Sequence, residues 1–315
     1  MNDLPRATLG RTGLEVSRLG YGAMELRGLE HFPRLSDQEA SELLNSVLDH
    51  GINYIDTSPD YGYSEDTIGK HIAHRRDEFF LASKCGCPIE PVDVAYQNRR
   101  PHSFTRENIR AGVEQSLTRM KTDRLDVVQF HLSPSRTVLE QNDSIAELEA
   151  LRQAGKVRFI GMSGTIPELA EHIEMGVFDV FQIPYSLLER EHGELMSAAA
   201  QSGAGVVVRG GVARGVFVKD ESIIDEYPEF LRPGFRFRRR LWQEAAIDEL
   251  LEDMTPMEFT LRFTLSHPAM TTTIVGTAKS AHLDSNVAAA AKGALPQSLY
   301  DEALKRIQAA AQRLG

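Results

Sequence analysis

The sequence predicts an α/β fold: a (β/α)8 (TIM) barrel with an N-terminal β-hairpin and long βα loops at the carboxyl ends of its strands. Short apolar segments alternate with amphipathic helical stretches from residue 36 to about 290. The apolar segments are unbroken, as strands of a parallel sheet covered on both faces require. Counting gives eight βα units, close to the expected size of such a barrel. No linker rich in Ser, Gly or Pro divides the chain, so we expect one domain over residues 1–315.

The predicted strands are short apolar runs. We expect them at residues 18–22, 52–55, 79–83, 125–130, 157–161, 180–183, 205–208 and 271–275. A doubly wound open sheet is the rival architecture. It usually carries Gly-x-Gly-x-x-Gly after its first strand, and "YGAMELRG" at residues 21–28 does not match that pattern.

The predicted helices begin at Ser or Thr residues followed three positions later by Glu, which is a capping-box pattern. Such pairs occur at Ser36 and Glu39, Ser144 and Glu147, Thr165 and Glu168, and Thr255 and Glu258, the last with Pro256 at the first helical position. Residues 105–120 carry Ile109, Val113 and Leu117 at helical spacing, which predicts one further helix.

Three segments do not fit the βα repeat. Residues 7–17 predict a hairpin that turns at Gly10 to Gly13 and closes the barrel bottom. Residues 85–104 form a long insertion after Lys84, and residues 213–250 form a large loop with its own helix. Within this loop, residues 232–242 hold five arginines among aromatic residues. Because the loop precedes the last strand, these arginines would either contact substrate or pair with the acidic stretch at 219–230.

Charge and composition limit the kinds of partner. The chain has 315 residues and a formal net charge of −10, which argues against nucleic acid or an anionic membrane. No apolar run approaches the roughly 20 residues that span a bilayer, and the N-terminus lacks a signal-peptide layout. The two cysteines, Cys85 and Cys87, favour a reducing, cytoplasmic location. Cys-x-Cys supplies only two of about four zinc ligands, so we expect plain thiols and no metal.

Polar side chains end several of the predicted strands. In a (β/α)8 barrel the active site lies at these carboxyl ends. Asp56, Lys84 and His131 follow three adjacent strands, and Tyr61 comes shortly after Asp56. Solvation alone does not require such a convergent set, so we expect a proton-handling site.

The chemistry of this set is specific. A phenol with a pKa of about 10 donates a proton poorly near neutrality. A neighbouring ammonium, here Lys84, lowers that pKa, and a carboxylate, here Asp56, keeps the ammonium charged and oriented. A neutral imidazole at His131 holds a carbonyl oxygen in place beside Tyr61. None of these groups supplies hydride, so the set implies a nicotinamide cofactor.

Six segments in order carry a resemblance to a known family. They are "INYIDTSPDYG", "LASK", "VVQFH", "IGMSG", "FQIPYSLLER" and "TIVGTAKSAHLDSN". Together they resemble the aldo-keto reductase superfamily through essentially the whole chain. The resemblance implies a (β/α)8 barrel that reversibly reduces aldehydes or ketones with NADPH. Residue by residue, it implies Tyr61 as proton donor, tuned by Lys84 and Asp56, and His131 as the group that orients the substrate carbonyl.

The resemblance also implies where the cofactor binds. Ser163 and Gln182 would hydrogen-bond the nicotinamide carboxamide, and Lys279 would neutralise the 2′-phosphate, which favours NADP while NAD remains possible. The remaining implied contacts are Gly22, Met24, Arg209, Gly210, Val212, Gly276, Thr277, Ser280, His282 and Asn286.

Two positions depart from the family pattern. Ser163 is followed by Gly164 where the family usually has Asn, so one carboxamide contact would be missing or supplied by backbone. Arg209 occupies the place of an aromatic residue that stacks on the nicotinamide. A guanidinium plane stacks on rings but repels an oxidised, positively charged nicotinamide. We therefore expect Arg209 to change the cofactor preference or potential.

Two alternative functions stay open at this point. A cofactor-binding regulatory subunit on the same barrel would carry the same residues and differ only in turnover. A lyase that uses Lys84 as a Schiff-base nucleophile would leave Tyr61 and residues 276–286 unexplained. The sequence predicts neither the physiological substrate nor the oligomeric state.

Overall fold

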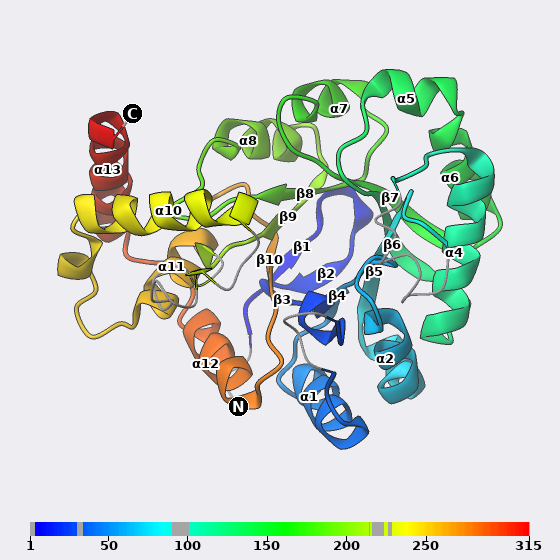
Figure 1. Ribbon diagram of the computed structural model, residues 1–315, viewed down its shortest axis with the longest axis horizontal. Helices are drawn as coiled ribbons and strands as arrows, with labels where there is room; N and C mark the ends of the chain where they lie inside the picture. Colours follow the sequence, from blue (N-terminus) through cyan, green and yellow to red (C-terminus); the bar gives the residue numbers. More distant parts are fainter. Residues whose placement is uncertain are drawn as a thin grey trace.

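The computed structural model describes residues 4–29, 34–89, 101–213, 215, 224–225 and 229–314. Eight parallel strands close into a barrel in the order β10-β3-β4-β5-β6-β7-β8-β9, and Figure 1 shows helices around its outside. The barrel strands are β3 (Leu19–Gly22), β4 (Tyr54–Asp56), β5 (Phe80–Cys85), β6 (Leu125–Phe130), β7 (Val157–Ser163), β8 (Val180–Pro184), β9 (Gly205–Arg209) and β10 (Thr272–Val275). The helices are α1 (Asp37–Asp49), α2 (Ser64–His71), α4 (Arg106–Met120), α5 (Arg136–Gln141), α6 (Ser144–Gln153), α7 (Leu169–Met175), α8 (Gly193–Gln201), α10 (Arg232–Glu244), α11 (Pro256–Leu265), α12 (Ser280–Ala291) and α13 (Gln297–Leu314). The (β/α)8 prediction is confirmed, and the doubly wound alternative is wrong.

Burial on two faces explains the unbroken apolar strands. Every residue of β6 is buried, because one face lines the barrel interior and the other packs under helices. Parallel pairing then brings the strand ends to one level; Lys84 of β5, for example, lies opposite Gln129 of β6. The polar residues at the strand exits therefore meet at one end of the barrel.

The predicted helix starts are confirmed in part. Ser36 and Glu39 form a complete capping box at α1, and Thr255 caps α11 through the Glu258 N–H. The other two predicted caps are wrong. The Ser144 hydroxyl donates instead to the Phe104 carbonyl, 2.6 Å away, and Asp143 precedes the helix. The Thr165 N–H donates to the Ser133 hydroxyl at 3.1 Å, and α7 begins only at Leu169.

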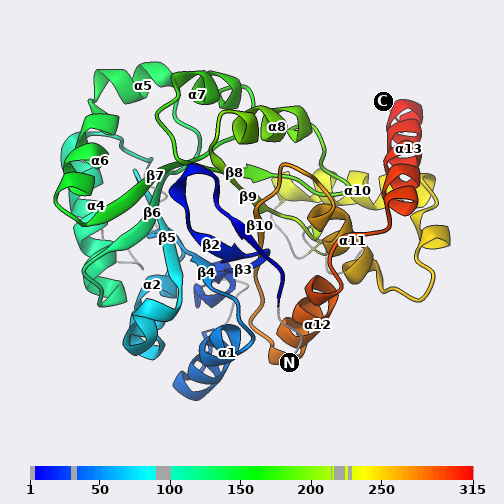
Figure 2. The same ribbon diagram turned by 180° about the vertical axis from the view of Figure 1, so that it is seen from behind.

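The N-terminal hairpin closes the amino-terminal end of the barrel, as predicted. Strands β1 (Arg6–Thr8) and β2 (Glu15–Ser17) pair antiparallel around a turn at Gly10–Thr12, and Figure 2 shows them across the barrel opening. Their apolar side chains join the inward-facing residues of the strands in one cluster. The cluster holds Leu9, Leu14, Val16, Tyr54, Ala82, Val127, Val180 and Val207.

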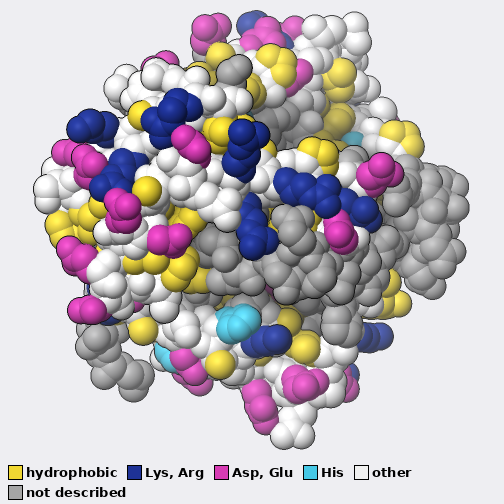
Figure 3. Space-filling model, turned by 60° about the vertical axis from the view of Figure 1, so that its left-hand side comes forward, with side chains coloured by type: hydrophobic (Ala, Val, Ile, Leu, Met, Phe, Trp, Pro, Cys, Tyr) yellow, Lys and Arg dark blue, Asp and Glu magenta, His cyan; other side chains and the backbone are white. Residues whose placement is uncertain are grey.

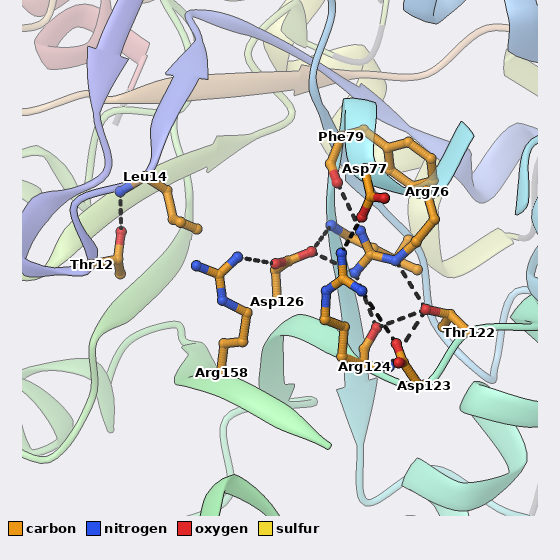
Figure 4. A network of polar contacts seen from close by, with 11 residues as sticks. Thr12, Leu14, Arg76, Asp77, Phe79, Thr122, Asp123, Arg124, Asp126 and Arg158 are labelled. Carbon is orange, nitrogen blue, oxygen red and sulfur yellow. Dashed lines mark hydrogen bonds and ion pairs between the residues drawn. The ribbon is translucent and has the colours of Figure 1, made fainter. Parts of the chain in front are cut away.

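A buried carboxylate links three strands near the same end. Asp126 accepts hydrogen bonds from Arg76 and Arg158, both at 2.6 Å, and from the Leu81 N–H at 2.8 Å. Figure 4 shows Asp126 between the two guanidinium groups. Both carboxylate oxygens accept hydrogen bonds, as a buried charge requires. This acid therefore has a structural role far from the polar strand exits.

The arginine-rich segment forms α10, which confirms a helix within residues 213–250. Arg236 pairs with Asp225 at 2.6 Å, and Arg238 pairs with Glu189. The predicted pairing with the acidic stretch is thus confirmed at Arg236. Figure 3, in which the left-hand side of Figure 1 comes forward, shows acidic side chains among the basic ones. No described helix is both long and apolar enough to cross a membrane, and residues 90–100 of the predicted insertion lie outside the described part of the chain.

Candidate active site

A buried ion pair lies at the carboxyl ends of β4 and β5. The Lys84 Nζ donates to Asp56 Oδ2 at 2.7 Å and to the Thr57 carbonyl at 2.8 Å. Both charged side chains are only 1% exposed. Removing either partner would leave the other charge buried without compensation.

Two amide side chains complete the environment of Asp56. Its second oxygen, Oδ1, accepts from Gln129 Nε2 at 2.9 Å and from Gln182 Nε2 at 2.8 Å. The Ser163 hydroxyl in turn donates to Gln182 Oε1 at 3.3 Å. Asp56 therefore connects the ends of β4, β5, β6 and β8, so that Ser163 and Gln182 are held in one network with Lys84.

Tyr61 lies over this pair. The loop after β4 turns through the Tyr61 N–H to Ser58 carbonyl hydrogen bond, 3.0 Å long. It places the Tyr61 ring centroid 4.9 Å from Lys84 Nζ and 6.3 Å from the His131 ring, which is edge-on at 82°. The structure thus brings together the four predicted catalytic residues, Asp56, Tyr61, Lys84 and His131.

Burial controls the pKa values in this site. Burial raises the pKa of Tyr61, and the nearby Lys84 charge only partly counters it, because Asp56 acts in the opposite direction. The expected net lowering of the Tyr61 pKa is therefore wrong. Burial by itself lowers the pKa of Lys84, but Asp56 and Tyr61 raise it more, so that Lys84 stays charged. Burial lowers the pKa of His131 to about 4, so its imidazole is neutral at pH 7.

Sequence reasoning missed the surroundings of His131. Its Nδ1 lies 3.3 Å from Asp60 Oδ2, 3.2 Å from His102 Nε2 and 3.3 Å from Cys87 Sγ. Asp60 directly precedes Tyr61, and this position beside the predicted proton donor is the sequence signal that could have identified it. His102 lies near the end of the insertion at residues 85–104. No local sequence pattern indicates that this part of the insertion lies beside the strand ends.

The predicted cofactor contacts Gly22, Arg209 and Gly276 lie at or directly after the ends of β3, β9 and β10. A Cβ added to Gly276 would lie 2.7 Å from the Gly22 carbonyl oxygen, so the ends of β3 and β10 touch through backbone. Met24 is 38% exposed beside them. At the end of β9, the Arg209 charge acts to lower the Tyr61 pKa, against the larger effect of burial. Gly210 and Val212 follow, with Gly210 at a φ of 72°.

The predicted adenosine contacts gather at the amino-terminal end of α12. This helix begins at Ser280 without a side-chain cap, and Lys279, Ser280 and His282 are exposed there. The Thr277 hydroxyl accepts from the Lys279 N–H at 3.0 Å, while Asn286, about two turns into the helix, is buried. A helix N-terminus with an exposed lysine fits a phosphate group, so the residues present suit a phosphorylated dinucleotide.

Packing accounts for Gly164. A Cβ at this position would lie 2.8 Å from Leu169 Cδ1 of α7, so a larger residue would need the Leu169 side chain to move. The Gly164 N–H donates to the Gln182 carbonyl at 3.0 Å, next to Ser163. At the position where the family usually has Asn, Gly164 therefore packs closely against Leu169 of α7.

The barrel and its strand-end residues define the class of protein as a barrel oxidoreductase. The chain belongs to the Aldo/keto reductase family, which matches residues 18–309. It is thus an oxidoreductase of a family that uses nicotinamide cofactors.

Relatives and solved structures agree with this membership. The chain is 28% identical over 309 residues to the uncharacterized oxidoreductase YqkF of Bacillus subtilis (strain 168), covering 95% of this chain and 94% of the relative. It is 29% identical to a D-threo-aldose 1-dehydrogenase of Pseudomonas sp, covering 92% and 94%. The aldo-keto reductase AKR11C1 from Bacillus halodurans, in its holo form, superposes with a TM-score of 0.77 at 26% identity, covering 98% of this chain and 96% of that chain.

Proposed function

We propose that this protein reversibly reduces an aldehyde or ketone to the alcohol with NADP(H). The observation that carries the proposal is the buried Lys84–Asp56 pair, 2.7 Å apart, directly beneath the ring of Tyr61 with His131 at its edge. Within one barrel end this set offers an acid, a charge that stabilises its conjugate base and a neutral hydrogen-bonding group.

The proposed mechanism divides the work among these residues. When bound, the nicotinamide cofactor supplies hydride to the carbonyl carbon. Tyr61 stays protonated because its pKa is raised, and it donates its proton to the carbonyl oxygen. Lys84 stabilises the phenolate that remains until it regains a proton from solvent, and Asp56 holds Lys84 in place. The neutral His131 imidazole orients the carbonyl oxygen beside the phenol.

The proposal assigns the cofactor to the strand ends and α12. Ser163 and Gln182 are the carboxamide ligands, and Lys279 at the α12 N-terminus is the 2′-phosphate ligand. Thr277, Ser280, His282 and Asn286 complete the adenosine site. The exposed lysine is the reason to favour NADP over NAD.

Titration with NADPH and NADH, followed by a panel of aldehydes and ketones, tests the function. We expect tighter binding of NADPH and cofactor oxidation with at least one carbonyl. Cofactor binding without turnover across the panel would favour the regulatory-subunit alternative. The lyase alternative requires a Lys84 with a lowered pKa, whereas Asp56 keeps it raised; borohydride trapping on Lys84 would revive it.

Arg209 gives a prediction about cofactor preference. Arg209 ends β9, and its guanidinium is expected to disfavour the positively charged oxidised nicotinamide. Arg209→Tyr should therefore strengthen NADP+ binding relative to NADPH and raise the ratio of alcohol oxidation to carbonyl reduction. Unchanged affinities for both cofactor forms, with an unchanged ratio, would remove Arg209 from this role.

A further inference from the structure

Four side chains of three types converge beside the proposed active site. They are Asp60, Cys87, His102 and His131, and one ligand atom from each lies within 4.8 Å of every other. Asp60 comes from the loop after β4, Cys87 and His102 from near the two ends of the insertion at residues 85–104, and His131 from the position directly after β6. Segments far apart in the sequence thus meet at one point.

The four polar atoms lie closer together than their hydrogen bonds require. A neutral imidazole nitrogen makes one hydrogen bond, as donor or as acceptor. Yet His131 Nδ1 has three polar neighbours within 3.3 Å: Asp60 Oδ2, His102 Nε2 and Cys87 Sγ. His102 Nε2 also lies 2.9 Å from the same Asp60 oxygen. A cation among the four atoms would satisfy all of them at once.

The spacing and the donor types point to one class of ion. Nitrogen and oxygen ligands at about 2.05 Å around a tetrahedral zinc stand about 3.3 Å apart, and a thiolate sulfur stands slightly farther away. The distances around His131 Nδ1, from 3.2 to 3.3 Å, are close to this spacing. Asp60 Oδ2 and His102 Nε2 stand closer, at 2.9 Å, and all four atoms lie within 4.8 Å of one another, so small side-chain adjustments would complete a tetrahedron. One thiolate, two imidazoles and one carboxylate form a mixed set that favours zinc over magnesium or calcium.

We propose that Asp60, Cys87, His102 and His131 bind one zinc ion. Four protein ligands fill a tetrahedral site, so the zinc has a structural rather than a Lewis-acid role. The side chains of His102 and His131 are 13% and 12% exposed and that of Asp60 is 26% exposed, so an ion can enter from solvent.

The site would fix the proposed carbonyl-orienting residue. A neutral imidazole that binds metal through Nδ1 carries its proton on Nε2. His131 would then be held in one tautomer, with an N–H donor on the side away from the metal. This consequence rests on the proposed function, whereas the metal site itself does not.

The proposal differs from the sequence-based expectation of two plain thiols. Cys85 and Cys87 do not act as a pair, because Cys85 lies in the main apolar core and only Cys87 reaches the cluster. The other three ligands are Asp60 in the loop after β4, His102 in the insertion and His131 after β6, so no second Cys-x-Cys is needed. Cys85 therefore provides a matched control two residues away.

Metal analysis of the reduced, purified protein tests the site. The chain is stripped with a chelator, loaded with Zn2+ or Co2+ and desalted. We expect about one metal per chain in the wild type and in Cys85→Ala, and a value near zero in Cys87→Ala and in His102→Ala. The Co2+ form should show a thiolate-to-cobalt charge-transfer band that Cys87→Ala abolishes. Far-UV circular dichroism checks that each variant is folded.

Two results would overturn the proposal. One is a wild-type chain that retains no stoichiometric Zn2+ or Co2+ after loading, which would leave the cluster as a hydrogen-bond network. The other is equal metal content and the same cobalt spectrum in wild type, Cys87→Ala and His102→Ala. Because metal content is read without substrate or cofactor, failure here is distinct from failure to turn over a carbonyl.

Discussion

At the scale of single residues, the contact between Lys84 and Asp56 organises the carboxyl end of the barrel. The two charges are nearly inaccessible, and Asp56 also binds Gln129 and Gln182. The pair therefore has both a stabilising role and, in the proposed mechanism, the role of holding a charge beneath Tyr61.

Asp56→Asn tests the energetic part of this statement. The substitution keeps the shape but leaves the Lys84 ammonium buried without its counter-charge, so we expect unfolding to become easier by about 3 kcal/mol. Urea unfolding measures the difference. Asp37→Asn is the control, since Asp37 pairs with Lys70 at the surface and its loss should be undetectable. Equal stability of Asp56→Asn and wild type would contradict this account.

The residues that sequence reasoning found and missed differ in one physical respect. Asp56, Lys84 and His131 directly follow predicted strands, and parallel strands end together, so their meeting was predictable. Asp60, Cys87 and His102 lie on loops, and a loop's path depends on packing that no short pattern encodes. Charge partners were predictable, but the balance of burial and charge that raises the Tyr61 pKa required the observed geometry.

At the scale of elements, the hairpin that closes the barrel depends on a close backbone approach. Gly10 has a φ of 49°, and a Cβ there would lie 2.2 Å from the Gly205 N. Gly13 has a φ of 69°, but nothing lies within 4 Å of its added Cβ. Both glycines have a left-handed backbone, but only at Gly10 would an added Cβ collide with neighbouring backbone. Comparing substitutions at the two positions therefore separates the effect of this contact on stability from the effect of backbone conformation.

Gly10→Ala should destabilise the protein by at least about 3 kcal/mol, because the hairpin must move away from β9. Gly13→Ala should cost only about 1 kcal/mol, the penalty of a left-handed residue with a side chain. Thermal or urea unfolding compares them directly. Similar losses in both variants would show that the contact with β9 contributes little.

Helix starts illustrate why elements are only partly predictable. Ser36 caps α1 as its pattern predicts, whereas Ser144 has the same pattern but bonds to Phe104. A hydroxyl orients toward the partner that the folded chain offers, so a distant carbonyl that it donates to competes with the local N–H from which a cap would accept. Element existence was therefore predictable, while the exact start depended on tertiary contacts.

At the scale of the whole molecule, buried histidines predict sensitivity to acid. Burial lowers the pKa values of His172, His192 and His267 below the ordinary 6.5. As pH falls below about 6.5, the unfolded chain takes up protons that the native chain does not, so stability is lost. We expect the free energy of unfolding to fall between pH 7 and pH 5.

His172→Gln checks the source of this slope. His172 is fully buried, with Nε2 placed 2.7 Å from the Pro134 carbonyl, and glutamine cannot titrate there. The variant should lose less stability than wild type over the same pH range, whatever its stability at pH 7. An unchanged slope would exclude His172 as a contributor.

The fold as a whole was the most predictable feature, because eight apolar runs and the helices between them already specify a closed parallel barrel. The single-domain organisation over residues 1–315 remains a prediction, as do the cofactor contacts.

The central claim is that the Tyr61 phenol delivers the proton during carbonyl reduction. Steady-state NADPH oxidation with an active aldehyde, compared in wild type, Tyr61→Phe and Tyr63→Phe, tests it most directly. Tyr63→Phe is the control, because it removes the same hydroxyl group two positions away, from a ring that lies under Arg34. We expect Tyr61→Phe to lose about 10²-fold or more in kcat while NADPH binding is kept, and Tyr63→Phe to stay near wild type. Full turnover by Tyr61→Phe would contradict the proposed mechanism.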